Sequence, residues 1–156
     1  MKHFATTILS IALLLSVGCI HKTGGTVTPW ERVTTDNAVF TQSLNTIEQG
    51  TEAAAVSGVI ANDKAAEVLG FVKLASQDDQ QITAILDKGG SVSLADYNTI
   101  QGLISQLSAS GQELVTSGGI GVKNPLTQQN IAQDIQNATA LASALLTDVQ
   151  AVKGAN

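Results

Sequence analysis

The sequence predicts an all-α protein, an up-down-up-down four-helix bundle that occupies residues 28–156 and follows a leader and a short tether. Three observations predict this fold. Apolar or small residues recur at spacings of three and four along four stretches of the chain, as on the buried face of a helix. Short turn signals containing Gly, Asn or Pro separate the stretches, which favours antiparallel neighbours. Much of the 44% hydrophobic content is alanine, which favours helix over strand.

The first helix is predicted to begin at Thr28-Pro29-Trp30-Glu31. Thr28 is the expected N-cap, Pro29 suits the first helical position, and Glu31 completes a T-x-x-E capping box. Trp30 is expected either to close the end of the core or to lie at a membrane interface. The buried stripe of this helix is predicted to be Trp30, Val33, Asn37, Phe40, Leu44, Ile47, Thr51, Ala54, Gly58 and Ala61.

The turn into the second helix is expected at Asn62-Asp63, with one of these residues capping that helix. A break near Gly50 is the alternative. The stripe of the second helix is predicted to be Ala65, Val68, Val72, Ala75, Asp79, Ile82 and Leu86. Gly89-Gly90 then ends the helix.

The third helix has the clearest start. Ser93 is the predicted N-cap with Asp96 three residues later, and Val92 and Tyr97 are placed for a hydrophobic staple across the cap. The stripe continues through Ile100, Ile104, Leu107, Gly111 and Leu114. Glycines inside these helices, such as Gly111, indicate either tight packing or local bends.

The fourth helix is predicted to follow Gly118-Gly119 and to begin at Asn124-Pro125, a cap followed by a proline in the first turn. Its stripe is Ile131, Ile135, Ala138, Ala142, Leu145, Val149 and Val152. Lys153 is expected in the last turn, where the helix dipole favours a cation.

Composition excludes several classes of function. The 156 residues suffice for one domain, 13% are charged and the formal net charge is −5. The eight basic residues are scattered singly, whereas nucleic-acid binding requires a basic stripe, so no nucleic-acid partner is expected. The two histidines are His3 and His21, both before the predicted bundle, and no Glu-x-x-His pair occurs. We therefore expect no enzyme, no metal site and no cofactor.

Residues 1–18 have the features of a secretory signal peptide. Lys2 gives the positive start, an apolar run from Ile8 to Val17 follows, and small Gly18 precedes Cys19, the single cysteine. Leu15, Ser16, Val17, Gly18 and Cys19 together resemble the lipobox of bacterial lipoproteins. The commonest form has leucine three residues before the cysteine, where this chain has Ser16.

The resemblance implies that Leu15 to Gly18 are read by the lipoprotein signal peptidase, and that Cys19 becomes the acylated N-terminus. Acyl chains such as palmitate then hold residues 19–27 as a short tether on membrane lipid. Lipidation also explains one unpaired cysteine in an exported protein. Ile20, in place of an aspartate after Cys19, implies the outer membrane or cell surface in a Gram-negative host. A plain signal peptide and an uncleaved anchor over Phe4 to Ile20 are the alternatives.

Two further features of the sequence bear on its chemistry. Asp79 lies on an apolar stripe beside Asp78. We expect Asp79 to be partly exposed near a helix bend, and contact with a divalent cation is the alternative. Thr116 to Pro125 contains three glycines and a lysine but lacks the order of a phosphate-binding loop, so a turn between helices is expected.

These features predict a lipid-anchored bacterial envelope protein with a structural or protein-interaction role and an envelope protein as its partner. One alternative is a carrier that holds a small apolar ligand between helices. Another is a phage-encoded lipoprotein of lysis or exclusion.

Overall fold

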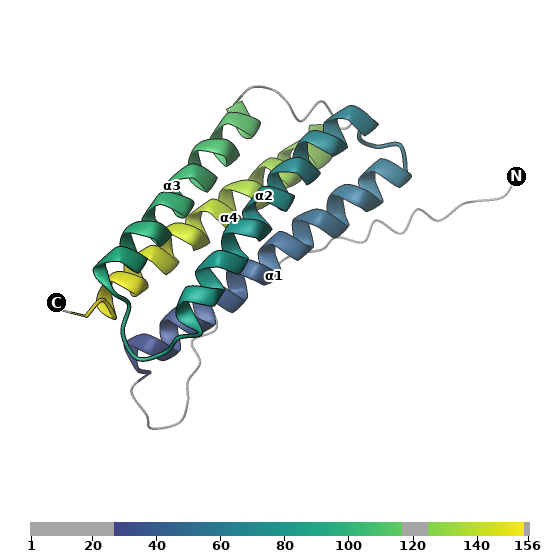
Figure 1. Cartoon of the computed structure of the whole chain (residues 1–156). Helices are drawn as coiled ribbons and strands as arrows, with labels where there is room; N and C mark the ends of the chain where they lie inside the picture. Colours follow the sequence, from purple (N-terminus) through teal and green to yellow (C-terminus); the bar gives the residue numbers. More distant parts are fainter. Residues whose placement is uncertain (1–26, 117–124, 155–156) are drawn as a thin grey trace, which may run out of the picture.

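A computed structural model describes residues 27–116 and 125–154 of the chain. Four helices account for most of these residues: α1 (Pro29–Val56), α2 (Asn62–Leu86), α3 (Leu94–Thr116) and α4 (Pro125–Ala151). They run alternately up and down in one elongated bundle (Figure 1). Helix α1 packs between α2 and α4, and α3 packs between the same two neighbours. The predicted all-α, up-down-up-down bundle is confirmed.

Each end of the bundle contains the starts of two helices and the ends of the other two. We call the end where α1 and α3 begin and α2 and α4 end the near end (Figure 1). The opposite end, where α1 and α3 end and α2 and α4 begin, is the far end. The helices antiparallel to each other are therefore always the neighbours that touch.

The predicted stripes form the core. In α2, all seven predicted positions are buried, and in the other helices the stripe is buried over most of its length. The largest side chains that are almost completely buried are Phe40, Leu44, Ile82, Ile100, Ile135 and Leu145. Trp30 is half-buried and packs against this core, as expected of a residue that closes its end.

The predicted starts of α1 and α3 are confirmed, as is the position of Pro125 at the start of α4. The Thr28 side chain accepts a hydrogen bond from the Glu31 amide at 3.2 Å, and the Glu31 carboxylate accepts one from the Thr28 amide at 2.8 Å. Ser93 accepts from the Asp96 amide at 3.1 Å and donates its hydroxyl to the Asp96 carboxylate at 2.9 Å. Pro125 is the first residue of α4.

The turn between α1 and α2 comes earlier than predicted. Gly58 has a φ of +70°, which ends α1 at Val56, and buried Ile60 then brings the chain back to the core. Asn62 is already the first residue of α2, and the N-cap is Ala61, which offers no capping side chain. The predicted turn and cap at Asn62-Asp63 were therefore wrong. The alternative break near Gly50 was also wrong, since Gly50 lies within α1.

The chain after α4 is fastened to the loop between α2 and α3. Val92 donates its amide to the Val152 carbonyl at 3.2 Å and accepts from the Gly154 amide at 3.0 Å. Lys153 lies beyond the end of α4, not in its last turn as predicted, and its Nζ is 4.6 Å from the centre of the Tyr97 ring. Gly89 and Gly90, both with positive φ, make the sharp turn after α2 that the sequence predicted.

Candidate functional site

The predicted lipidation site lies outside the described residues. This holds for Cys19, for Leu15, Ser16, Val17 and Gly18 before it, for His21, and for the glycine-rich segment 117–124. The structure describes the chain from Val27 onward, and α1 begins two residues later.

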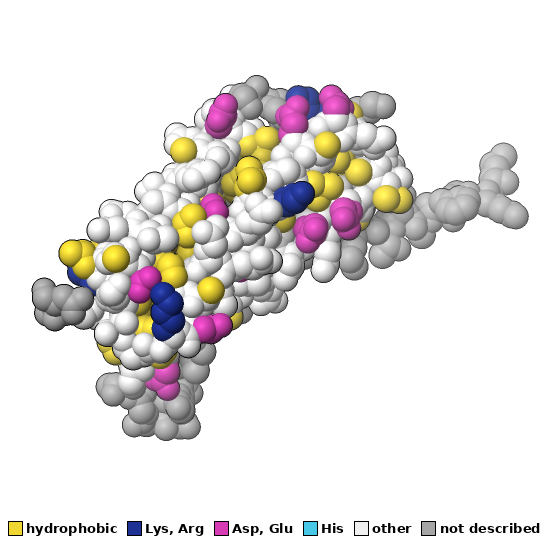
Figure 2. Space-filling model, viewed as in Figure 1, with side chains coloured by type: hydrophobic (Ala, Val, Ile, Leu, Met, Phe, Trp, Pro, Cys, Tyr) yellow, Lys and Arg dark blue, Asp and Glu magenta, His cyan; other side chains and the backbone are white. Residues whose placement is uncertain are grey.

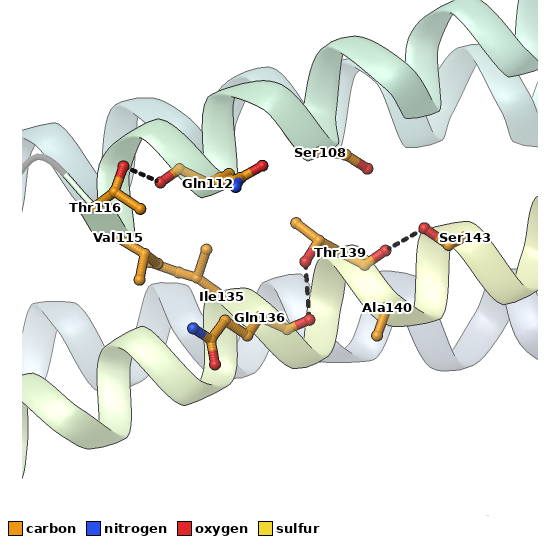
Figure 3. Close-up of a pocket in the computed structure, with 10 residues that line it drawn as sticks. Ser108, Gln112, Val115, Thr116, Ile135, Gln136, Thr139, Ala140 and Ser143 are labelled. Carbon is orange, nitrogen blue, oxygen red and sulfur yellow. Dashed lines mark hydrogen bonds between the residues drawn. The ribbon is translucent and has the colours of Figure 1, made fainter.

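A groove between α3 and α4, with a volume of about 400 Å³, is one candidate site in the bundle (Figure 3). Gly111, Val115, Ile135 and the Thr139 methyl group provide its apolar lining. Ser108, Gln112, Thr116, Gln136 and Ser143 provide its polar groups, and none of the lining residues is charged. The volume is within the range of small-molecule sites.

Three of the four hydroxyl groups that line this groove are engaged within their own helices. Thr139 donates to the Gln136 carbonyl at 2.8 Å, Ser143 to the Thr139 carbonyl at 3.0 Å, and Thr116 to the Gln112 carbonyl at 2.8 Å (Figure 3). Their protons are therefore not directed at a ligand. The groove also offers apolar contacts and the side chains of Ser108, Gln112 and Gln136, which can donate as well as accept hydrogen bonds, so an uncharged ligand with an apolar part fits it.

A second groove lies between α1 and α2, and most of its lining residues are polar. Asn37 and Thr41 of α1 face Thr83 and Asp79 of α2; we call these four residues the α1–α2 polar cluster. The Asn37 Nδ2 donates to Thr83 Oγ1 at 2.8 Å, and Thr41 Oγ1 lies 2.7 Å from Asp79 Oδ2.

Asp79 is more buried than the sequence indicated. Only 5% of its surface is exposed, so the expected partly exposed position was wrong. Burial raises the pKa of the Asp79 carboxyl, and the hydrogen bond from Thr41 lowers this pKa to a smaller extent. Asp79 Oδ1 and Asn37 Oδ1 are both buried without a hydrogen-bond partner.

Several carboxyl groups outside this cluster have a raised pKa. Burial raises the pKa of Asp36 on α1, and the neighbouring carboxyl of Asp148 on α4 raises it further, whereas the charge of Arg32 lowers it. Burial also raises the pKa values of Asp78 and Asp134. Asp78 faces the other side of α2, toward Gln106 and Ser110 of α3, so the adjacent carboxyls Asp78 and Asp79 do not converge.

Within residues 27–116 and 125–154, no group of three or more His, Cys, Asp and Glu side chains is placed to hold a metal ion. None of the four helices described here is both long and apolar enough to cross a membrane. Most of the face seen in Figure 2 is uncharged, with acidic and basic side chains scattered across it.

Sequence reasoning missed both grooves. Gly111 was placed correctly on the buried stripe, but the stripe does not reveal which residues of α4 lie against it. Asp79 was singled out as a carboxyl on an apolar stripe, yet its partner Thr41 is 38 positions away and on another helix. The available signal was a polar residue on the stripe of each helix. These residues are Asn37 on α1, one turn before Thr41, and Asp79 on α2.

No family model, curated protein or solved structure matches this chain.

Proposed function

We propose that this protein is a lipid-anchored bacterial envelope protein, held on membrane lipid through an acylated Cys19, with a non-enzymatic structural or protein-interaction role. The observation that carries the proposal is the sequence from Leu15 to Cys19, which resembles a lipobox at the end of an apolar run. A compact helical body that begins soon after Cys19 supports it.

The length of the tether limits how far the bundle can lie from the membrane. The nine residues 20–28 separate Cys19 from the start of α1, and even fully extended they span at most about 30 Å. Acylated Cys19 would hold the near end of the bundle within this distance of the bilayer. Helix α1 has 28 residues and is about 42 Å long, so the far end can reach farther from the lipid surface than the near end.

The anchor is tested by intact mass spectrometry of the membrane fraction, comparing the natural protein with Cys19→Ser. We expect residues 19–156 plus a diacylglycerol, with or without a further acyl chain, and loss of this mass in the variant. Ser16→Leu, which brings the segment to the commonest lipobox form, is the matched control and should be processed at least as well. An unmodified natural chain, or one cut elsewhere, would refute the anchor.

A partner is proposed to bind at the far end. Val56, the last residue of α1, is 91% exposed there, whereas most large apolar side chains are buried. A photo-reactive residue in place of Val56 should cross-link an envelope protein in intact cells. The same residue in place of Leu94, which is 53% exposed at the near end, is the control. Equal cross-linking at both positions, or at neither, would argue against a partner at this end.

The α3–α4 groove favours a second candidate, a carrier of a small apolar ligand. Ser108 projects from α3 toward α4, so Ser108→Leu is expected to fill the groove (Figure 3). Ser105→Leu, at an exposed position of the same helix that does not line the groove, is the control. A fatty acid or detergent should raise the unfolding temperature of the control but not of Ser108→Leu. No shift in either protein would exclude the carrier.

A further inference from the structure

The contact between α1 and α2 holds a carboxyl group that has too few hydrogen-bond donors to be ionised. Thr41 has a single hydroxyl proton, but two acceptors compete for it: Asp79 Oδ2 at 2.7 Å and the Asn37 carbonyl at 3.0 Å. Asp79 Oδ1 is buried and has no partner. An ionised Asp79 would therefore keep, at best, one shared donor for its two oxygens, in a place where 5% of the residue is exposed.

No opposite charge compensates for this shortage. From α1, the residues lining the groove around Asp79 are Thr34, Asn37, Ala38 and Thr41, and none is charged. From α2, the one other charged residue in the groove is Asp87, which is acidic and exposed. Asp78, the nearest charge along α2, faces α3. In this part of the chain, the groove offers an Asp79 carboxylate no cation.

A proton on Asp79 completes the hydrogen bonds. The protonated Oδ2 donates to Thr41 Oγ1 across the 2.7 Å contact, and the Thr41 hydroxyl is then free to donate to the Asn37 carbonyl. Oδ1 becomes the carbonyl oxygen of a neutral acid, which costs far less to bury than a charged oxygen. The direction of the Asp79 pKa agrees with this count.

We propose that α1 is held against α2 by a proton-dependent contact at Asp79, so that loss of this proton loosens α1 from the bundle. The other three helices stay together, because α3 packs against both α2 and α4 independently of α1. Helix α1 is thus a pH-responsive element of the fold, whether or not Cys19 carries a lipid.

The direction of the pH effect follows from linkage. The folded-state pKa of Asp79 is raised above the ordinary value of 3.8. The stabilisation that its proton provides is therefore complete below the unfolded-state pKa. It is lost as the pH rises through the raised folded-state value.

The test is hydrogen exchange of backbone amides, corrected for the intrinsic exchange rate, from about pH 4 to pH 7. In the natural chain, protection of α1 amides should fall roughly tenfold or more relative to α3 amides over this range. Asp79→Asn supplies an Nδ2 donor to Thr41 and cannot ionise, so this variant should lose most of the pH dependence. Asp87→Asn, at the exposed carboxyl of the same groove, should retain it.

Two results would overturn the proposal. One is a natural chain in which protection falls equally in all four helices, and the other is an unchanged pH dependence in Asp79→Asn. If this variant fails to fold, carbonyl-carbon NMR titration of the natural chain decides instead. The Asp79 carboxyl should titrate above the ordinary value of 3.8, and titration at that value would also refute the proposal.

Discussion

Gly111 on α3 lies against Thr139 on α4 so closely that a Cβ atom built at Gly111 would be 2.8 Å from Thr139 Cγ2. It would also be 3.3 Å from a ring carbon of Phe71. Gly111 is therefore a packing residue, which decides between the packing and bending roles that the sequence left open. We expect Gly111→Ala to lower the free energy of unfolding by about 1–2 kcal/mol, because overpacking outweighs the better helix propensity of alanine.

The rescue variant for this prediction is Thr139→Ser, which removes the methyl group that the new Cβ would meet. In urea unfolding, the double variant Gly111→Ala with Thr139→Ser should recover most of the stability lost in Gly111→Ala. Additive losses in the double variant would show that the contact between these two residues is not the cause.

Gly70 and Gly102 are expected to behave in the opposite way. Both are exposed within helices, and a Cβ at either position would meet no atom within 4 Å. Replacing each with alanine should raise the free energy of unfolding by about 0.5–1 kcal/mol, because alanine restricts the unfolded chain and favours helix. Urea midpoints at constant slope measure this effect, and a destabilisation by either change would contradict it.

Thr51 is completely buried in α1, and its hydroxyl oxygen has no hydrogen-bond partner. Valine has nearly the same shape without the polar group, so Thr51→Val should stabilise the protein by about 1 kcal/mol or more. Thr46→Val in the same helix is the control, since the Thr46 hydroxyl donates to the Gln42 carbonyl at 3.0 Å. Thermal unfolding that places both variants at the same midpoint would argue against an unpaired hydroxyl at Thr51.

The bridge between Val92 and the residues after α4 gives a prediction about the chain terminus. Deleting residues 153–156 removes the 3.0 Å hydrogen bond from Gly154 to Val92 and the contact of Lys153 with Tyr97. We expect a loss of about 1–2 kcal/mol in unfolding free energy, with faster hydrogen exchange at the Val92 amide. Deleting residues 155–156 alone is the control and should change neither quantity.

Local signals explain how much of the fold was predictable. The start of α1 at Thr28 and Glu31, the stop at Gly89-Gly90 and the start of α3 at Ser93 depend on residues within a few positions of one another. The end of α1 was misplaced because Asn62-Asp63 resembles a cap, whereas a left-handed Gly58 and the burial of Ile60 determine the turn. Burial of Ile60 is a tertiary contact, which no local pattern reveals.

The candidate sites were less predictable for the same reason. The α3–α4 groove depends on which turns of two helices face each other, and the polar cluster depends on the register that places Thr41 beside Asp79. Sequence periodicity gives the buried face of each helix but not its axial shift against a neighbour. A shift by one turn would separate Thr41 from Asp79 and leave every predicted stripe unchanged.

The packing of α1 against α4 also constrains the order of assembly. A ribosome releases the chain from its N-terminus, so α1 is the first of these helices to be made and α4 the last. Until α4 is complete, the side of α1 that it will cover remains in contact with water or with other molecules. A nascent chain that stops within α4 therefore exposes apolar surface, and such chains are expected to be the ones that aggregate or are degraded.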